Sequence, residues 1–314
     1  MFRRILVPLD GSRFSEHAIP RAAQIASVGG GSLHLVTVAL PETSAGPRTS
    51  PPSAADRDEA ARAAERYLQE VEERIRASKG SVEVTRKVIP AGNVIRSLIR
   101  EVDEEGSDLI AMTTHGRGAW ARAWLGSVAD GVLRQAHKPV LLIRPPESGE
   151  EEVDPGPAFP MDLPPFRRIL VPLDGSRAGR AALAPARDLA GAKGARLTLF
   201  QAVPPPTAGA YPYMTLPARE EDLPENLLAE ARAELEKVAV GLRDRGLSVD
   251  VRVDVHNQPG LAILRHLEKE GADLVAMSTR GRGGVARLIL GSVADKVIRG
   301  SPVPVLVYRP EVED

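Results

Sequence analysis

AMTTHGRG at residues 111–118, followed by LGSVAD at residues 125–130, carries the strongest structural signal in the chain. Asp108–Thr114 is short and apolar, as expected of a buried strand, and Ser127–Ala136 has the apolar spacing of a helix. A loop that contains glycines joins them. A strand, a glycine loop and a helix N-terminus can together bind phosphate, because glycine lets the backbone approach the anion and the helix presents N–H groups.

The chain carries this pattern twice. AMSTRGRG at residues 276–283 leads to LGSVAD at 290–295, and FRRILVPLDGSR near the start recurs unchanged at 166–177. Copies this long are duplicated domains, because solenoid repeats are much shorter. We predict a first domain over residues 1–145, a linker rich in proline and acidic residues over 146–165, and a second domain over 166–314.

Strands and helices alternate within each copy. Alternation of this kind predicts an α/β fold, in which helices cover both faces of a parallel sheet. Right-handed crossovers then give two tandem doubly wound, Rossmann-like domains, each with a five-stranded parallel sheet in the order 3-2-1-4-5. The predicted strands are 4–9, 33–39, 81–89, 108–114 and 139–143 in the first copy, and 168–173, 196–203, 247–255, 273–279 and 303–308 in the second. The predicted helices are 15–26, 54–77, 93–104 and 127–136, then 178–191, 225–245, 260–270 and 292–299.

Composition excludes several classes of protein. The 314 residues include 41 basic and 42 acidic side chains, so the net charge of −1 does not favour nucleic acid or an anionic membrane as a partner. The sequence contains no apolar run of the roughly 18 residues that a spanning helix needs. It has no cysteine, which excludes disulfides and cysteine nucleophiles. It begins on a strand pattern without the features of a signal peptide, so we expect a cytoplasmic protein.

Two crevices are the candidate binding sites. In open α/β sheets, ligands bind beyond the carboxyl ends of the strands where the strand order reverses. Asp10 and Thr113–Gly118 would flank one such crevice, and Asp174 and Ser278–Gly283 the other. Asp10 could accept hydrogen bonds from ribose hydroxyls or hold a hydrated cation. The alternative is that Asp10-Gly-Ser only caps the next helix.

The residues around the glycine loops could likewise have either a structural role or a role in binding. Ser127 and Ser292 open a helix, where serine is a preferred N-cap and where phosphate also binds. Arg117 and Arg282 could offset triphosphate charge. His115 is a polar contact residue rather than a catalytic base, because the second copy has Arg280 in its place.

The motifs of the common nucleotide-dependent and hydrolytic enzymes are missing. The sequence has no GxxxxGK[ST] and no GxGxxG after the first strand, which excludes a P-loop and argues against a dinucleotide site. It has neither a nucleophile elbow nor a defensible serine–histidine pair. Its six histidines show no metal-ligand spacing, so we predict no metal site and no catalytic residue.

Each half resembles the universal stress protein (UspA) family. The resemblance rests on the opening VPLDGS, the THGRG loop, Gly126-Ser127-Val128 nine residues after Gly116, and the closing KPVLLIR. The ATP-binding branch of that family carries G-x2-G-x9-G-(S/T). Gly116, Gly126 and Ser127 match it here, but its first glycine is Thr113 in one half and Ser278 in the other.

The resemblance implies that each half binds ATP or another adenine nucleotide, with or without Mg²⁺. The residues it implies are the aspartate after the first strand, a second-strand residue beside the adenine, and the glycine loop with the helix after it. These are Asp10, Val38, Thr113, His115, Gly116, Arg117, Gly118, Gly126 and Ser127 in the first half, and Asp174, Ala202, Ser278, Arg280, Gly281, Arg282, Gly283, Gly291 and Ser292 in the second.

Three functions stay open at this point. The first is a stress-response protein that binds adenine nucleotide, and the second is an interaction protein whose glycine loops are only structural. An enzyme is not expected, although slow ATP hydrolysis stays open. The resemblance also implies that the two halves pack together through their fifth strands, Pro139–Ile143 and Val303–Tyr308, and it is compatible with a homodimer.

Overall fold

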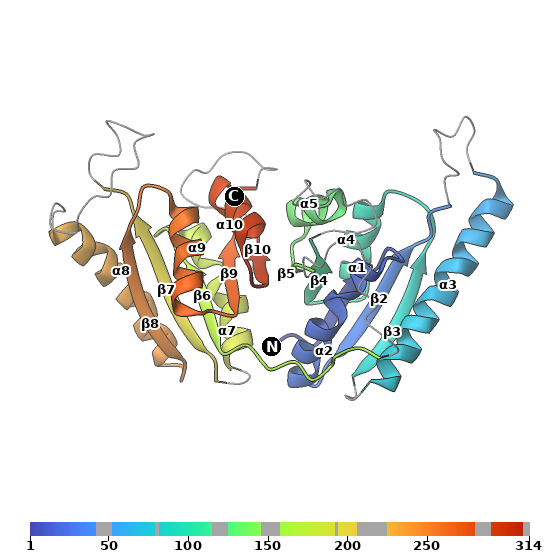
Figure 1. Ribbon diagram of the computed structural model, residues 1–314, viewed down its shortest axis with the longest axis horizontal. Coiled ribbons are helices and arrows are strands. Elements are labelled where there is room, and N and C mark those ends of the chain that lie inside the picture. The colour runs from blue at the N-terminus through green and yellow to red at the C-terminus, as the bar shows by residue number, and fades with distance from the viewer. Residues whose placement is uncertain are drawn as a thin grey trace. The chain divides into compact units, whose positions relative to one another are not determined.

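The computed structural model divides into two compact units, Phe2–Pro165 and Phe166–Asp314 with Met1 (Figure 1). Each unit is an α/β domain and is described by itself. The described residues are 1–41, 52–78, 82–114, 125–145, 158–191, 194–205, 225–279 and 290–309.

Strands and helices alternate in the first unit as the sequence predicts. The strands are short and most of their buried positions are apolar, whereas most of the helices carry charged residues. The elements are β1 (Arg4–Pro8), α1 (Arg13–Glu16), α2 (Ala18–Gly29), β2 (Ser32–Val38), α3 (Ala54–Ala77), β3 (Glu83–Ile89), α4 (Val94–Glu104), β4 (Leu109–Thr113), α5 (Ser127–Gln135) and β5 (Val140–Ile143).

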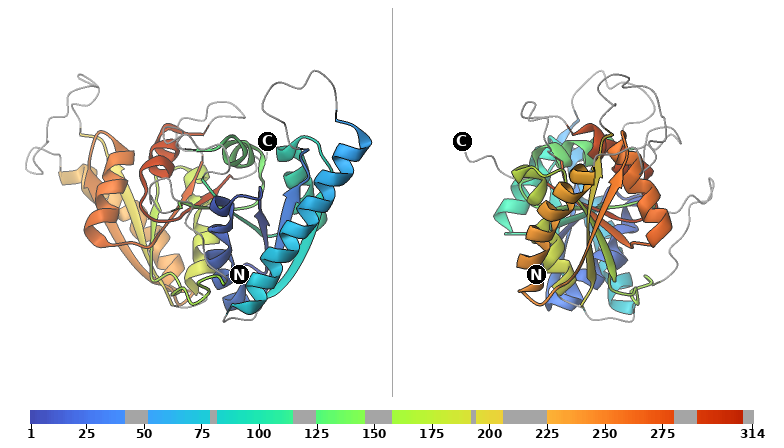
Figure 2. Two further views of the ribbon diagram at one scale, coloured as in Figure 1. Left: turned by 45° about the vertical axis from the view of Figure 1, so that its right-hand side comes forward. Right: turned by 90° about the vertical axis from the view of Figure 1, so that its left-hand side faces the viewer.

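The five strands form a parallel sheet in the order β3-β2-β1-β4-β5, which confirms the predicted order. β1 lies at the centre, and Ile5, Leu6 and Val7 have no exposed surface. Right-handed crossovers place α2 and α3 on one face, and α4 and α5 on the other. α3 runs along β2 and β3, and α4 packs against α5 (Figure 2). The strand order therefore reverses between the neighbouring strands β1 and β4.

The helix after β1 is broken, which corrects the single helix predicted over residues 15–26. α1 ends at Glu16, and α2 begins at Ala18. Pro20 has no backbone N–H with which to bond the carbonyl of Glu16, so a continuous helix would lose a hydrogen bond and clash at this point. The helix predicted over residues 178–191 is also broken: α6 ends at Arg180 and α7 begins at Leu183. Pro185 lies one position later in the second copy than Pro20 does in the first, and it likewise has no N–H with which to bond the carbonyl of Ala181.

The second unit repeats the first. β6 pairs in parallel with β7 and β9, β7 pairs with β8, and β9 pairs with β10, so the order is again 3-2-1-4-5. Its elements are β6 (Arg168–Pro172), α6 (Arg177–Arg180), α7 (Leu183–Gly191), β7 (Arg196–Val203), α8 (Glu225–Arg243), β8 (Ser248–Val255), α9 (Pro259–Glu270), β9 (Leu274–Ser278), α10 (Ser292–Gly300) and β10 (Val305–Tyr308).

The described end of the predicted linker belongs to the first unit. Residues 158–165 cluster with that unit, and Phe159 within them is only 4% exposed. This part of the stretch is therefore packed against a domain, whereas composition alone suggests an extended connector.

Candidate functional site

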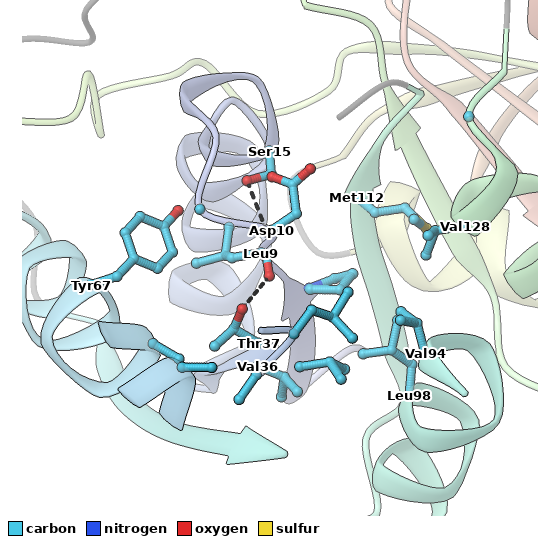
Figure 3. Close-up of a pocket in the computed structure, with 18 of the residues that line it drawn as sticks. Leu9, Asp10, Ser15, Val36, Thr37, Tyr67, Val94, Leu98, Met112 and Val128 are labelled. Atoms are coloured by element: carbon cyan, nitrogen blue, oxygen red, sulfur yellow. Dashed lines mark hydrogen bonds between the residues drawn. The ribbon is translucent and has the colours of Figure 1, made fainter. Parts of the chain in front are cut away.

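A cavity of about 800 Å³ opens at the carboxyl ends of β1, β2 and β4 in the first unit. This volume lies in the usual range for small-molecule sites. Apolar side chains form much of its wall, including Val36 and Met112 from the strands and Leu98 from α4 (Figure 3). α3 closes one side and the N-terminus of α5 another. The cavity lies where the strand order reverses, as predicted.

Asp10 stands on the wall of this cavity, and its carboxylate is held in place by the turn that follows it. Its Oδ1 accepts hydrogen bonds from the N–H of Ser12 at 2.9 Å and from the Ser12 hydroxyl at 2.6 Å. Ser12 is the N-cap of α1 and accepts the N–H of Ser15. Ser12, not Asp10, therefore caps α1. Asp10 accepts hydrogen bonds from Ser12, and it is an exposed residue on the cavity wall.

The N-terminus of α5 also lines the cavity. Its N-cap is Gly126, with no side-chain cap, and Ser127 is the first helical residue, so the expected serine N-cap is wrong by one position. The N–H of Gly126 donates to the carbonyl of Thr114 at 2.7 Å, which turns the helix start toward the cavity. First-turn N–H groups have no partner within their own helix, so they can bind an anion here.

Two further predicted residues end strands at the cavity. Val38 is the last residue of β2 and Thr113 is the last residue of β4, and both line the cavity. Thr113 is only 6% exposed. The cavity therefore brings together five of the residues predicted in the first half: Asp10, Val38, Thr113, Gly126 and Ser127.

The predicted residues of the second unit occupy the corresponding elements. Asp174 follows β6, and its Oδ1 accepts the N–H and the hydroxyl of Ser176 at 3.0 and 2.6 Å. Gly291 is the N-cap of α10, again without a side-chain cap, and Ser292 is the first helical residue. Ala202 lies on β7 and Ser278 ends β9. The eight predicted loop residues lie outside the described residues: His115, Gly116, Arg117, Gly118, Arg280, Gly281, Arg282 and Gly283.

Tyr67 of α3 is a wall residue that the sequence analysis did not identify. Its hydroxyl lies 3.3 Å from the Oε1 of Glu16, a carboxylate that is almost completely buried. Burial raises the pKa of Tyr67 above its usual value, and the negative charge of Glu16 raises it further. The hydroxyl therefore stays protonated at neutral pH. Its proximity to the cavity depends on a long-range contact, which the local pattern does not encode.

A second buried polar cluster lies away from the cavity. The Nε2 of His34 is 2.9 Å from the Oε1 of Glu101, and the three side chains of His34, Glu101 and Glu105 have ligand atoms within 4.8 Å of one another. The ammonium of Lys87 lies 2.7 Å from the other oxygen of Glu101. Because a cation of the chain already neutralises this carboxylate, the cluster is better described as an ion-pair network than as a metal site.

Comparisons with known proteins agree with this geometry. The model of the universal stress protein family matches residues 1–144 and 165–309. A universal stress protein of Mycolicibacterium smegmatis is 28% identical over 318 residues, which cover 98% of this chain and 97% of that protein. One of Mycobacterium tuberculosis is 34% identical over 195 residues, covering 62% of this chain but only 59% of the relative's own length.

A solved structure extends the likeness to the whole chain. The crystal structure of a universal stress protein from Archaeoglobus fulgidus aligns with 99% of this chain and 97% of its own, with a TM-score of 0.67 and 25% identity. In the described part of the chain, every helix is too short or too polar to cross a membrane.

Proposed function

The chain belongs to the universal stress protein family as a tandem of two family domains, and from this premise we propose that it binds ATP or another adenine nucleotide. The observation that carries the proposal is the cavity of the first domain. The carboxylate of Asp10 and the N-terminus of α5, which has no side-chain cap, both line this largely apolar cavity. Asp10 would accept the ribose hydroxyls, and the first turn of α5 would bind phosphate. The base would lie among the apolar side chains.

Each part of a nucleotide has a matching part of the wall. Val36, Leu98 and Met112 exclude water around the base, and a backbone group of Val38 at the end of β2 can hydrogen-bond to the edge of the base. The phosphates need positive potential, which the dipole of α5 supplies at Gly126 and Ser127. A Mg²⁺ ion would arrive with the triphosphate as part of the ligand.

The second domain supports a second site by the same argument. Asp174 and the N-terminus of α10 repeat the two polar anchors, and the hydrogen bonds around Asp174 repeat those around Asp10 to within about 0.1 Å. We therefore expect up to two nucleotides per chain. Binding is proposed to change the shape or the partners of the protein, and no catalytic role is assigned to any side chain.

A second candidate function rests on Thr113. This residue places a Cβ and a hydroxyl on the cavity wall, at the position where the ATP-binding branch of the family has a glycine. If these atoms block the phosphates, the domains are interaction modules whose glycine loops are structural. Replacing Thr113 with glycine distinguishes the two functions. In an interaction module, the replacement would create nucleotide binding. In a domain that already binds nucleotide, it would change the affinity only moderately.

The direct test is titration calorimetry with ATP, adenosine and tripolyphosphate, after bound ligand has been removed. The proposal predicts saturable heat with ATP and weaker binding of the two fragments, because each fragment reaches only one of the two anchors. Absence of ATP heat in the wild type, with binding gained in Thr113→Gly, would support the interaction module instead.

A further inference from the structure

Residues 158–165, which follow the first domain, pack on the far end of α3. The N–H of Phe159 donates to the hydroxyl of Ser78, the C-cap of that helix, at 2.8 Å. The guanidinium carbon of Arg74 lies 4.4 Å from the centre of the Phe159 ring, within the range of a cation–π contact. Arg21 of α2 donates to the carbonyl of Pro164 at 2.8 Å. The segment is therefore bound to the domain by an aromatic anchor and two hydrogen bonds.

Arg74 connects this anchor to a buried carboxylate. Its Nη1 lies 2.7 Å from the Oε2 of Glu16, whose side chain is 2% exposed. The Nε and Nη2 of Arg74 are buried without a hydrogen-bond acceptor among the described residues. The guanidinium is thus held by one carboxylate and by the ring of Phe159. Removing the ring would let it turn toward water or another acceptor, because two of its nitrogens lack an acceptor to hold them.

Glu16 leads from Arg74 to the cavity. Its other oxygen, Oε1, lies 3.3 Å from the hydroxyl of Tyr67, and the preceding residue, Ser15, also lines the cavity. The hydroxyl of Ser15 accepts the N–H of Asp10 at 3.3 Å (Figure 3). It also donates to the carbonyl of Ser12 at 2.8 Å. Glu16 therefore contacts the α3 wall through Tyr67, and it directly follows Ser15, whose hydroxyl holds the turn that carries the proposed ribose-binding carboxylate.

The second domain is built differently at this point. Gly179 and Arg180 replace Ser15 and Glu16. A Cβ at Gly179 would lie 2.5 Å from the Oδ1 of Asp174, so a serine does not fit there without a shift. Arg180 points to Glu234 of α8, with 3.6 Å between the charged atoms. A buried carboxylate in this position is thus a feature of the first domain.

We propose that Glu16 is a positioning residue of the first nucleotide site, and that the docked Phe159 segment sets the affinity of this site through Arg74 and Glu16. The inference rests on the proposed nucleotide binding. With the segment docked, Arg74 fixes Glu16, and Glu16 holds Tyr67 and the Asp10 turn in the shape that receives the ligand. With the segment undocked, the site keeps its residues but loses this preorganisation, so nucleotide binds more weakly.

The test is ATP calorimetry in an Asp174→Ala background, which weakens the second site by the larger factor expected for loss of the acceptor, so that the first site is fitted as the tighter of the two. Phe159→Ala is expected to weaken ATP binding about 3- to 30-fold, the range of coupling seen along packed networks. Glu16→Gln should weaken it at least as much. Because both changes act through one relay, the double variant should bind no more weakly than Glu16→Gln alone.

A matched control separates coupling from lost stability. Val71 lies on α3 between Tyr67 and Arg74 and is 1% exposed, and its aliphatic side chain has no polar atom with which to join the relay. Val71→Ala should destabilise the domain and leave ATP affinity unchanged. The relay is rejected if Phe159→Ala binds ATP like its parent, if the two effects multiply, or if Val71→Ala weakens binding equally.

Amide exchange measured by NMR without nucleotide tests the relay on its own. Phe159→Ala should speed exchange of the N–H groups of Asp10 and Ser12, whose hydrogen bonds define the turn. The N–H of Ser176, which makes the equivalent bond in the second domain, should not change. A wild-type protein that binds no ATP would reject the nucleotide proposal alone, whereas unchanged exchange at Asp10 and Ser12 would overturn the relay.

Discussion

Replacing Asp10 with asparagine tests the proposed ribose contact with little disturbance of the fold. The amide oxygen of asparagine can still accept the two hydrogen bonds of 2.9 and 2.6 Å that Ser12 donates to Oδ1. The substitution removes only the negative charge. Asp10 is exposed and water screens its charge, so we expect the free energy of unfolding to change by less than about 1 kcal/mol. A loss of ligand affinity therefore reports on the site itself.

The expected loss follows from the charge of the acceptor. A hydrogen bond to a charged group contributes about 1.5–3 kcal/mol, whereas one between neutral groups contributes about 0.5–1.5 kcal/mol. The difference of about 1–1.5 kcal/mol corresponds to ATP binding weakened roughly five- to tenfold at the first site. Asp10→Ala removes the acceptor entirely and should weaken binding by about 10- to 150-fold.

Calorimetric titration with ATP measures both variants, with Asp174→Asn as the matched change in the second domain. Each asparagine variant should weaken one of two sites and leave the other, and the double variant should weaken both. Wild-type affinity at both sites in Asp10→Asn and Asp10→Ala would refute the assignment of this carboxylate to the ligand.

Three further predictions concern stability, each measured by urea unfolding. Phe200→Ala should destabilise the second domain by about 3–5 kcal/mol, because this side chain is 1% exposed and its loss leaves a cavity; a change below 1 kcal/mol would contradict this. Glu101→Leu should cost about 1–3 kcal/mol by leaving the ring nitrogen of buried His34 without a partner, whereas the exposed Glu104→Leu should cost little. Burial lowers the pKa of His266 below its ordinary value of 6.5, so the unfolded chain takes up the proton first as the pH falls. The second domain should therefore lose stability from about pH 7 down to the lowered pKa, and His266→Gln should lose less between pH 7.5 and 5.5; equal losses would exclude His266 as the cause.

The sequence predicts the fold well because its signals are local and repeated. Apolar strands alternate with amphipathic helices in both copies, and the handedness of crossovers then leaves few possible strand orders. Predicted strand ends differ from the observed ends by at most two residues. The single helix predicted over residues 15–26 is wrong. The apolar spacing continues across the break and predicts one helix, but Pro20 lacks the N–H that a continuous helix needs.

The site is predictable only where it is built from the ends of predicted strands and helices. Asp10, Thr113 and Ser127 follow from topology, because parallel strands bring their carboxyl ends to one edge. Contacts between residues far apart in the chain do not follow from topology. The hydroxyl of Tyr67 contacts the buried carboxylate of Glu16, which lies 51 positions earlier in the chain. The N–H of Phe159 donates to the hydroxyl of Ser78, which lies 81 positions earlier.

The most direct test of nucleotide binding is mass spectrometry of the small molecules released when freshly purified protein is denatured in acid. We predict ATP or AMP at one to two molecules per chain, and less in Asp10→Ala. A chain that releases no adenine nucleotide, and that gives no heat when titrated with ATP, would contradict the account and leave the glycine loops with a structural role.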